Sequence, residues 1–439
     1  MKAKTYLTRI FLATLLVSVA PALAAQTADK EIVVFDNANS EVPYRIPALA
    51  YTRDGKLLAV CDYRLNKADI GINNHNGLSQ INEVMRISCD NGKTWGPITT
   101  VAQGDEKADN WRVAFGDPSI VADRESDEVL MLCAAGKVGY WGENRSTNQR
   151  RQDCALFRSH DGGTTWDQGE LRTDDIWGLY DGTLPGGESA QGLFITSGKI
   201  MQSRCIKVGC HYRIYAAHPV RPDSFDRRIG TFVIYSDNFG KTWKVLGGTD
   251  RPASIAQDEA KVEELPDGSV IVSCRDKDGG RRFNVFTYTN LITADGTWGE
   301  EVMPENMTRD SINAVNGEIM VVPVRNVKSG KSCHLLLQSI TQSPKRRTMG
   351  FYYKVVESRE DYASADRLGK GWIKALKITD STACYSTMVM MNDGHVGLLY
   401  EKNAYNEGYD IVFQRLSITE ITAGAYSYEQ KKCNNASCK

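Results

Sequence analysis

The chain has 439 residues, of which 41% are hydrophobic and 24% are charged, and its formal net charge is −1. These values are typical of a globular protein with a sizeable core, and they exclude a disordered chain. The balance of charges gives no reason to expect nucleic acid or an anionic membrane surface as a partner.

The N-terminus has the pattern of a secretory signal peptide. Basic residues precede an apolar run over residues 10–19 that is too short to span a bilayer, and residues 22–24 read Ala-Leu-Ala, an A-x-A cleavage site. We therefore predict a signal peptide over residues 1–24, export to the periplasm or out of the cell, and one mature domain over residues 25–439. The alternative is an uncleaved membrane anchor.

After the signal peptide, the sequence predicts short strands joined by polar turns. Strand-like residues 46–51 and 56–62 flank Thr-Arg-Asp-Gly, and Asp-Gly is a strong hairpin signal. The same dipeptide recurs at residues 267–268 and 393–394. Helical periodicity is scarce, and residues 359–367 are read as a short helix or a loop.

An octapeptide with the pattern Ser-x-Asp-x-Gly-x-Thr-Trp recurs along the chain. Complete copies begin at Ser88, Ser159 and Ser236, the last with Asn238 in the Asp position, and a degenerate copy spans residues 293–298. We expect the Asp or Asn side chain to bond backbone amides two residues on, Gly to supply a positive φ, and Trp to bury an apolar face beside the turn. Each copy therefore predicts the tip of a β-hairpin.

Strand-like residues precede each complete copy, and the interval between copies is long enough for a four-stranded sheet with its loops. That sheet is the unit of a β-propeller, so the predicted fold class is all-β, with about five to seven blades.

Cysteine usage decides little about the chemistry. The count of 11 Cys is odd, which excludes complete pairing within one chain. Cys205 with Cys210, and Cys433 with Cys438, are candidate disulfides that the sequence does not decide. No Cys/His spacing fits a zinc site.

The repeats resemble the Asp boxes (BNR repeats) of bacterial exo-α-sialidases, or neuraminidases, of the glycoside hydrolase family 33 type. Asp boxes also occur in other propellers, but further motifs of that family follow in the expected order over nearly the whole mature chain. They are Tyr-Arg-Ile-Pro at 44–47, Asp-Tyr-Arg at 62–64, Gly-Asp-Pro-Ser at 116–119, Asp-Glu-Ala at 258–260, Arg275, Arg346-Arg347, Cys-Tyr-Ser at 384–386 and Leu-Tyr-Glu at 399–401. The resemblance implies a six-bladed β-propeller.

The resemblance assigns three Arg residues to the carboxylate of a sialic acid, a task that suits permanently charged, bidentate donors. The matching residues are Arg45, Arg275 and Arg346, and Glu401 matches a carboxylate that orients Arg45. Neighbouring side chains of a strand point to opposite faces, so only one of Arg346 and Arg347 can point inward. Counting back from the following strand favours Arg346. Taken alone, Arg275 and Glu401 would be read as surface residues, and the motif around Arg45 would leave open whether that Arg lies on the surface of an edge strand or points into a central cavity.

The resemblance also assigns the reacting groups. Tyr385 matches the nucleophile, since a neutral hydroxyl avoids the repulsion that a carboxylate would meet from the substrate anion. A phenol ionises near a pH of about 10, so it needs a base, and Glu259 matches that partner. Asp69 matches the acid/base that protonates the leaving oxygen and later activates water, for which its pKa must be raised. Without the motif, Asp69 would be read as a solvated loop residue.

Arg64 and Asp117 match binding positions around the ring hydroxyl and N-acetyl groups of the sugar. Asp117 is alternatively a turn residue before the Pro that follows it. Val113, Phe115 and Trp141 are candidates for lining an apolar N-acetyl pocket, but the match around them is loose, and we do not include these residues in the predicted site.

The sequence therefore predicts an exo-α-sialidase that removes terminal sialic acid from glycoproteins, glycolipids and oligosaccharides. The reaction would retain configuration through a tyrosyl-glycosyl intermediate. We expect a monomer with no metal, no cofactor, no nucleic-acid partner and no membrane span. The alternatives are a trans-sialidase or intramolecular trans-sialidase on the same fold, and a propeller that only binds glycans. The presence of every catalytic residue type at a matching position argues against the last.

Overall fold

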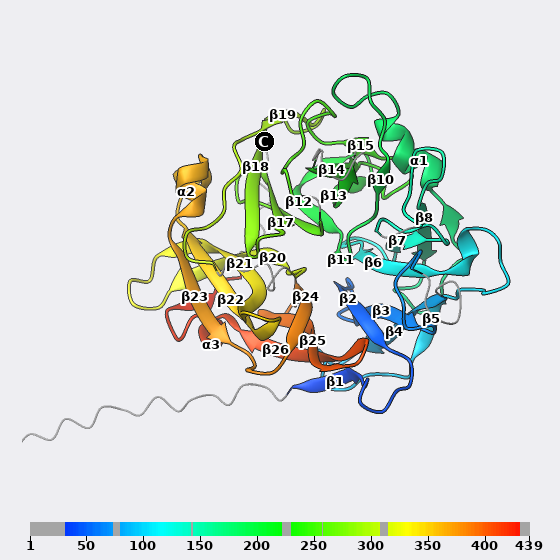
Figure 1. Ribbon diagram of the computed structural model, residues 1–439. Helices are drawn as coiled ribbons and strands as arrows, with labels where there is room; N and C mark the ends of the chain where they lie inside the picture. Colours follow the sequence, from blue (N-terminus) through cyan, green and yellow to red (C-terminus); the bar gives the residue numbers. More distant parts are fainter. Residues whose placement is uncertain are drawn as a thin grey trace, which may run out of the picture.

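The computed structural model describes residues 31–72, 80–141, 144–221, 230–256, 258–307 and 315–430. The predicted signal peptide and the Cys433–Cys438 pair lie outside the described residues. Six sheets of four or five strands follow one another around a central axis, in chain order (Figure 1). The protein is a six-bladed β-propeller, so the predicted fold is confirmed.

Three blades come from the first half of the chain. Blade 1 contains β2 (Tyr44–Tyr51), β3 (Leu57–Arg64), β4 (Ile81–Ser88) and β5 (Thr99–Ala102). Blade 2 contains β6 (Phe115–Ala122), β7 (Val129–Ala135), β8 (Asp153–Ser159) and β9 (Glu170–Leu171), with β11 (Gly198–Lys199) parallel to β6. Blade 3 contains β10 (Gly192–Leu193), β12 (Met201–Val208), β13 (His211–Arg221), β14 (Gly230–Ser236) and β15 (Lys244–Val245).

The remaining blades follow in the same way. Blade 4 contains β16 (Ala260–Glu264), β17 (Val270–Arg275), β18 (Arg281–Asn290) and β19 (Asp295–Trp298). Blade 5 contains β20 (Ile319–Asn326), β21 (Ser332–Ser343), β22 (Arg347–Val356), β23 (Trp372–Lys377) and β27 (Tyr426–Tyr428). Blade 6 contains β24 (Ala383–Met390), β25 (His395–Tyr405), β26 (Gly408–Ser417) and β1 (Ile32–Phe35).

Within the described ranges, the helices are short and lie between strands. They are α1 (Thr173–Trp177), α2 (Ala365–Gly369) and α3 (Ile418–Ile421), with 3-10 turns η1 (Trp111–Val113), η2 (Gly178–Tyr180) and η4 (Arg359–Tyr362). The stretch 359–367, predicted as a short helix or loop, forms η4 and most of α2. Its start is fixed by a capping box, in which the side chains of Ser358 and Asp361 each accept a bond from the other's backbone N–H.

Strands from both ends of the chain close the ring. In Figure 1 the blue β1 lies beside the red-orange β26, and the two pair antiparallel with Ile32 opposite Phe413. Asp410 reinforces this closure, because its carboxylate accepts hydrogen bonds from the backbone N–H of Asn37 (2.9 Å) and Ala38 (3.1 Å). Blade 6 therefore takes its outermost strand from the N-terminal part of the chain, which holds blades 6 and 1 side by side.

The hydrophobic core is divided among the interfaces between neighbouring blades. Between blades 3 and 4, for example, Tyr215 packs in one cluster with Phe286 and Trp298. A sheet that is covered on both faces needs apolar side chains on both faces, so its central strands do not alternate. Strand β7 reads Val-Leu-Met-Leu-Cys-Ala-Ala and is buried at every position. Strand cysteines such as Cys133 and Cys274 are buried in these interfaces.

Each complete Asp box forms the hairpin tip between the third and fourth strands of its blade, as predicted. In the first box the Asp90 carboxylate accepts a hydrogen bond from the Thr94 N–H (2.9 Å), and the Ser88 hydroxyl accepts one from the Gly92 N–H (2.9 Å). The expectation that Asp bonds an amide two residues on is wrong. The bonded amide is four residues on, because Gly92 and the residue before it both take positive φ and lengthen the loop.

The boxes also fasten each blade to the preceding one. A Cβ at Gly92 of blade 1 would come within 2.0 Å of the Phe413 ring of blade 6. A Cβ at Gly163 of blade 2 would come within 2.6 Å of Leu58 of blade 1. Box glycines are therefore required by close packing between blades as well as by φ.

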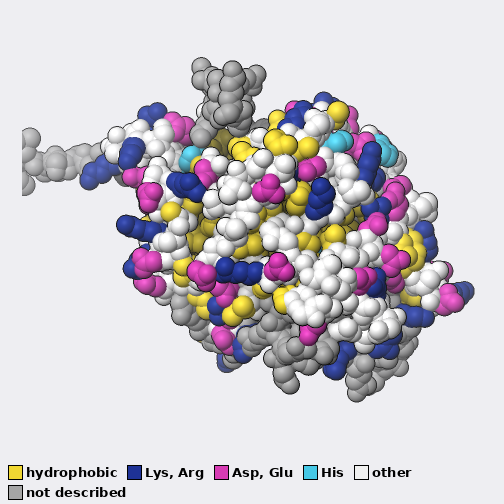
Figure 2. Space-filling model, turned by 90° about the horizontal axis from the view of Figure 1, so that it is seen from above, with side chains coloured by type: hydrophobic (Ala, Val, Ile, Leu, Met, Phe, Trp, Pro, Cys, Tyr) yellow, Lys and Arg dark blue, Asp and Glu magenta, His cyan; other side chains and the backbone are white. Residues whose placement is uncertain are grey.

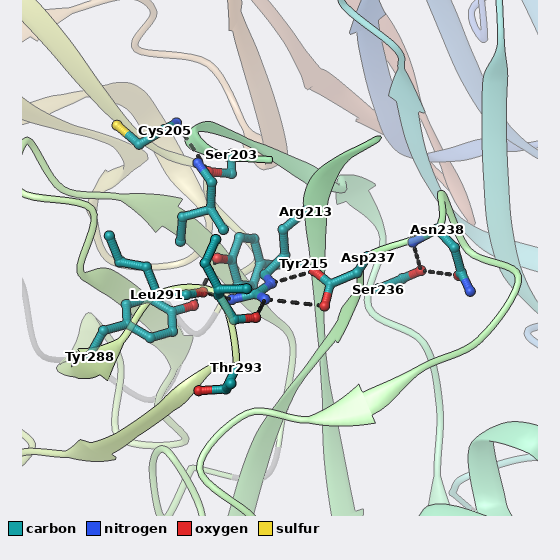
Figure 3. Close-up of polar contacts among 12 residues, drawn as sticks. Ser203, Cys205, Arg213, Tyr215, Ser236, Asp237, Asn238, Tyr288, Leu291 and Thr293 are labelled. Atoms are coloured by element: carbon teal, nitrogen blue, oxygen red, sulfur yellow. Dashed lines mark hydrogen bonds and ion pairs between the residues drawn. The ribbon is translucent and has the colours of Figure 1, made fainter. Parts of the chain in front are cut away.

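Arg213 joins the third box to the following blade (Figure 3). Its side chain is fully buried and forms an ion pair with Asp237 of the box (2.6 Å). The same guanidinium donates to the carbonyls of Leu291 (2.7 Å) and Ile292 (2.8 Å), just before the degenerate fourth copy. Arg213 thus supplies hydrogen bonds to the turn that precedes the fourth copy, which lacks some residues of the Asp-box pattern.

Cys205 and Cys210, both within the described ranges, do not form a disulfide with each other. On the face seen in Figure 2, Lys and Arg side chains alternate with Asp and Glu over the described surface. Within the described part of the chain, no helix is long and apolar enough to cross a membrane.

Candidate active site

A cavity of about 330 Å³ lies where inner strands of several blades begin. Its lining residues are Ile46, Asp69, Ile70, Ile72, Asp117, Tyr140, Trp141, Gln152, Phe194, Asp258, Glu259, Arg275 and Tyr385. Five of the residues predicted for the site, Asp69, Asp117, Glu259, Arg275 and Tyr385, therefore face one cavity although they come from four blades.

The inner strands are irregular where they carry site residues. β2, β6 and β24 each show a break in register, around Ile46, Asp117 and Tyr385 respectively. Ile46 and Asp117 have φ of 57° and 58°, a conformation that is unfavourable for non-glycine residues and above all for a β-branched one. Each precedes a proline, Pro47 or Pro118, which has no N–H for the ladder. The strands therefore bulge, which redirects the side chains at these positions.

Glu401 connects the first of the three predicted arginines to the predicted nucleophile. Its side chain is fully buried, and its Oε1 accepts hydrogen bonds from Arg45 Nε (2.8 Å) and from the Ile46 N–H (2.8 Å). Its Oε2 accepts a bond from the Tyr385 N–H (3.1 Å). Burial would raise the pKa of Glu401, but the charge and hydrogen bond of Arg45 outweigh it, so the pKa lies below its ordinary value. The surface-carboxylate alternative for Glu401 is wrong.

Tyr385, Glu259 and Arg275 make direct contacts. The Tyr385 hydroxyl donates to Glu259 Oε1, and Arg275 Nη1 donates both to Glu259 Oε2 (2.5 Å) and to the Tyr385 hydroxyl (2.9 Å). A backbone bond from the Arg275 N–H to the Glu259 carbonyl (2.8 Å) holds the start of β16 beside the end of β17. The predicted nucleophile, its predicted base and the second predicted arginine thus form one group.

The two partners of this hydrogen bond differ in proton affinity. Burial raises the pKa of the Tyr385 hydroxyl well above its ordinary value, and Arg275 opposes this only in part. Burial acts in the same direction on Glu259, but the charge of Arg275 outweighs it and lowers the pKa of that carboxyl. The resting site therefore holds a neutral phenol against an ionised carboxylate.

The third predicted arginine lies in the turn between β21 and β22. Arg346 is half-buried, and Cys384 raises the pKa of its guanidinium above the ordinary value, while burial, Arg275 and Arg45 oppose this. The charges of the three arginines therefore act on one another. Arg347 is exposed and donates to a backbone carbonyl of a neighbouring turn (3.3 Å). Arg346 is therefore the more buried of the two neighbouring arginines.

Arg64 lies between two carboxylates of its own blade. Its Nε and Nη2 donate to Asp62 Oδ2 (2.9 and 2.8 Å), and Nη2 also lies 3.4 Å from Asp69 Oδ1. The Asp69 side chain is 43% exposed and also accepts a bond from the Ile70 N–H (2.8 Å). Arg64 is buried and, like Arg45 and Arg346, is not among the residues that line the cavity; it lies behind Asp69.

Asp117 combines both readings made from the sequence. It does precede Pro118 in a bulge, and its side chain also lines the cavity. Burial and then the charges of Asp69 and Asp62 raise the pKa of Asp117 well above its ordinary value. Val113 and Phe115 are buried in the core and Trp141 alone of that loosely matching set lines the cavity, which supports leaving the first two out.

Sequence reasoning missed several residues of this region. Asp258 lies 3.3 Å from Arg275 Nε and lines the cavity beside Glu259, a position that its adjacency in sequence indicated. Tyr140 and Phe194 form an aromatic wall with ring centroids 4.9 Å apart, and they come from irregular segments that carry no motif. Tyr409 lies under the Arg45 guanidinium at 5.1 Å, which only the β25–β26 pairing could have indicated.

The arrangement suits acid/base chemistry on an anionic ligand. The cavity combines ionised arginine, a phenol bonded to a carboxylate, and a partly exposed carboxyl on another wall. Among the residues that the structure describes, no group of His, Cys, Asp or Glu side chains has the arrangement of a metal site.

Known proteins that resemble this chain in sequence include sialidases. Residues 74–398, more than half of the chain, match the BNR repeat-like domain family. The chain belongs to this family. The sialidase of Micromonospora viridifaciens is 28% identical over 368 residues, which cover 82% of this chain and 50% of that protein. The sialidase of Bacteroides fragilis is 24% identical over 409 residues, covering 87% of this chain and 63% of that protein.

Most of this BNR-repeat chain is thus homologous to sialidases, and it spans between half and two thirds of the length of those two relatives. Among solved structures, a leech intramolecular trans-sialidase superposes with a TM-score of 0.67 at 15% identity, covering 92% of this chain and 72% of that one. That likeness establishes the shared propeller fold. The predicted resemblance to Asp-box (BNR) sialidases is confirmed, since sialidase homologues cover most of the chain.

Proposed function

We propose that this protein is an exo-α-sialidase that removes terminal sialic acid from glycans with retention of configuration. The observation that carries the proposal is the contact of the Tyr385 hydroxyl with both Glu259 and Arg275 inside a cavity that Asp69 also lines. A phenol bonded to a buried carboxylate has little purpose in a module that only binds. The homologous sialidases support the same assignment.

In this proposal the arginines bind the sugar carboxylate. Arg45, Arg275 and Arg346 are separate in sequence, yet the charges of Arg45 and Arg275 both act on Arg346, so the three guanidinium groups lie near enough to repel one another although Glu401 and Glu259 pair with two of them. A bound carboxylate would relieve that repulsion and accept bidentate hydrogen bonds. Because Arg275 also donates to Glu259, the substrate would share this guanidinium with the base.

Bond making and breaking then follow from the positions of the acids. Asp69 gives its proton to the glycosidic oxygen, the Tyr385 oxygen bonds to the anomeric carbon, and Glu259 takes the phenol proton. The aglycone leaves as an alcohol. Ionised Asp69 next deprotonates a water, whose oxygen attacks the anomeric carbon. Tyr385 leaves and recovers its proton from Glu259, which restores the resting enzyme.

The test is hydrolysis of a fluorogenic sialoside by the full chain. Tyr385→Phe should lower kcat by about 10³-fold or more, because the nucleophile is lost, and Asp69→Ala by about 10²- to 10⁴-fold, because the general acid is lost. Tyr353→Phe, a buried tyrosine of β22 outside the cavity, should leave activity unchanged. Full activity in a variant that lacks both Tyr385 and Asp69 would refute the mechanism.

A second candidate is an intramolecular trans-sialidase, because a protein of that activity shares the fold. Both reactions would use the same nucleophile, so the site residues do not separate them. Time-resolved NMR of the products does: free sialic acid appearing first as the α-anomer supports hydrolysis, and an anhydro product supports internal transfer. Tight sialoside binding without turnover would instead favour a binding propeller.

The proposal includes export. The basic and apolar pattern at residues 1–24 supports it, and the cleavage site after Ala24 can be checked by N-terminal sequencing of protein recovered from the periplasm or medium. We also propose that the protein acts as a monomer, which light scattering would test.

A further inference from the structure

A pair of carboxyls is buried behind the proposed acid/base residue. Asp62 of β3 and Glu83 of β4 are direct cross-strand partners, and both are 0% exposed. Like charges directly opposite each other destabilise a sheet, and two ionised carboxylates without water between them are more costly still. The pair therefore needs either cations or a proton.

The two carboxyls are unequally supplied with hydrogen-bond donors. Asp62 accepts two bonds from Arg64, and its other oxygen accepts one from the Asp117 N–H (3.0 Å). Neither oxygen of Glu83 accepts a bond from an N–H or O–H group of the described residues. The carboxyl that faces it is Asp62, and two carboxyls can bond to each other only when one of them carries a proton.

The surrounding charges do not remove the need for that proton. The titratable or charged groups that act on Glu83 are Asp62, Arg64 and Cys61 of β3, Asp117 of β6 and Cys133 of β7. The one cation in this set, Arg64, is already divided between Asp62 and Asp69. Burial, then Asp62 and Asp117, raise the pKa of Glu83 well above its ordinary value. The pKa of Asp62 is raised less, to about 6.

We propose that Glu83 is un-ionised in the native protein, donates its hydrogen to Asp62, and is a positioning residue for Asp69. The proposal rests on the proposed function for the role of Asp69. With Glu83 neutral, Asp62 carries one negative charge, and Arg64 balances it while its Nη2 stays 3.4 Å from Asp69. A second negative charge in the pair would hold Arg64 more tightly and oppose ionisation of Asp69.

The first prediction concerns stability and needs no substrate. A carboxyl whose pKa is raised on folding stabilises the native state most below its unfolded pKa of about 4.3, and that stabilisation is lost as pH rises through the folded value. Glu83→Gln keeps a neutral donor of the same size and removes this dependence. The stability of Glu83→Gln relative to the wild type should therefore rise between a pH of about 5 and 8.

Urea unfolding of the full chain across that pH range measures the difference. Glu264→Gln is the matched control, because Glu264 is equally buried but accepts bonds from the Ser203 hydroxyl and the Arg204 N–H (2.7 Å). That variant should be less stable than the wild type at neutral pH. For each variant, the quantity compared is its free energy of unfolding minus that of the wild type at the same pH. If this difference for Glu83→Gln is lower at pH 8 than at pH 5, the proposal is overturned.

A measurement on the wild type covers the case in which Glu83→Gln does not fold. With ¹³C at the glutamate side-chain carboxyls, NMR separates ionised from un-ionised Glu without interference from Asp. We expect a Glu signal at the un-ionised position at pH 7, and Glu83→Gln, when it folds, should remove it. If every glutamate titrates as an ionised group at pH 7, the proposal is wrong.

The second prediction concerns turnover of a fluorogenic sialoside. Glu83→Gln should retain kcat at the optimum within about twofold, while the alkaline limb of kcat/KM moves downward by roughly one pH unit, because the pair can no longer gain the second charge that opposes ionisation of Asp69. Glu83→Ala, which leaves Asp62 without this donor, should lower kcat about five- to tenfold with little change in KM. Identical pH profiles for the wild type and Glu83→Gln would refute the positioning role.

Turnover tests the proposed function, whereas unfolding and NMR test the protonation of Glu83, so one proposal can be refuted without the other. If the wild type does not turn over sialosides, the proposed function is wrong, while the unfolding and NMR results still decide whether Glu83 is un-ionised. If the wild type is active but its stability profile parallels that of Glu83→Gln, the proposal for Glu83 fails and the proposed function stands.

Discussion

Replacement of Glu401 by Gln tests whether the site depends on contacts between blades. Glu401 lies in the middle of β25 in blade 6, and its carboxylate receives the guanidinium of Arg45 from blade 1 and two backbone N–H groups. The substitution keeps the size of the side chain and removes the charge. It leaves a guanidinium whose side chain is only 15% exposed without its counter-charge.

The expected cost follows from that burial. Removal of one partner from a buried ion pair costs about 3–5 kcal/mol, mostly because the remaining charge is left unpaired. Arg45 keeps some contact with solvent, so we expect the lower end, about 3 kcal/mol in the free energy of unfolding. The Tyr385 N–H loses its charged acceptor in the same variant, so kcat/KM should fall by about 10²-fold through misplacement of both groups.

Urea unfolding at pH 7 and hydrolysis of a fluorogenic sialoside measure the two effects. The control is Glu357→Gln, which removes an ion pair with Lys331 between two side chains that are more than half exposed and should change neither quantity. A Glu401→Gln protein as stable as the wild type would refute the reasoning, since the ion pair would then contribute nothing.

The pH dependence of the free energy of unfolding gives an independent check on whether ionised Glu401 stabilises the fold. The pKa of Glu401 is lowered on folding, so its contribution is present above the unfolded value of about 4.3 and is lost as pH falls through the folded value. The difference in stability between the wild type and Glu401→Gln should therefore be largest near neutral pH and shrink in acid. A difference that grows as pH falls below about 4 would contradict this account.

Further predictions concern the third arginine and the Asp boxes. Arg346→Ala should raise KM for a sialoside about tenfold or more, whereas exposed Arg347→Ala should leave KM unchanged; the reverse result would move the assignment to Arg347. Gly92→Ala should destabilise the protein by about 2 kcal/mol or more in urea unfolding, because the new Cβ would lie 2.0 Å from the Phe413 ring in addition to the strain of a positive φ. Gly182→Ala, with positive φ but no atom within 4 Å, isolates the strain and should cost less.

Much of the fold follows from local sequence. The turn chemistry of each Asp box is contained in eight residues, and the degenerate copy at 293–298 still places a hairpin, so a propeller of about five to seven blades could be predicted from local patterns, and the family resemblance implied six. The site was predictable in part for a similar reason. In a propeller the inner strands begin at one end of the central channel, so residues at strand starts such as Arg45 and Tyr385 meet even though they are far apart in sequence.

Contacts between neighbouring strands or blades were not predictable in this way. Glu83 occupies an ordinary position within a strand, and only the register that places it opposite Asp62 makes its carboxyl unusual. Arg64 was assigned to the ligand, yet its two bonds to Asp62 turn it toward the acid pair. The environment of such a side chain depends on which face of the strand it occupies. In strands that are buried on both faces, the apolar pattern does not distinguish the two faces, so the sequence does not predict this.

The resting geometry around Arg275 carries a consequence for substrate binding. This guanidinium lowers the pKa of Glu259 and bonds the Tyr385 hydroxyl, so before substrate binds it weakens the base that the phenol requires. A substrate carboxylate that binds Arg275 would draw it away from Glu259 and restore the basicity of that carboxylate. Binding of the acidic sugar would then itself activate the nucleophile. On this reasoning, a neutral analogue that lacks the carboxylate should lose kcat as well as affinity, because the base stays paired with Arg275.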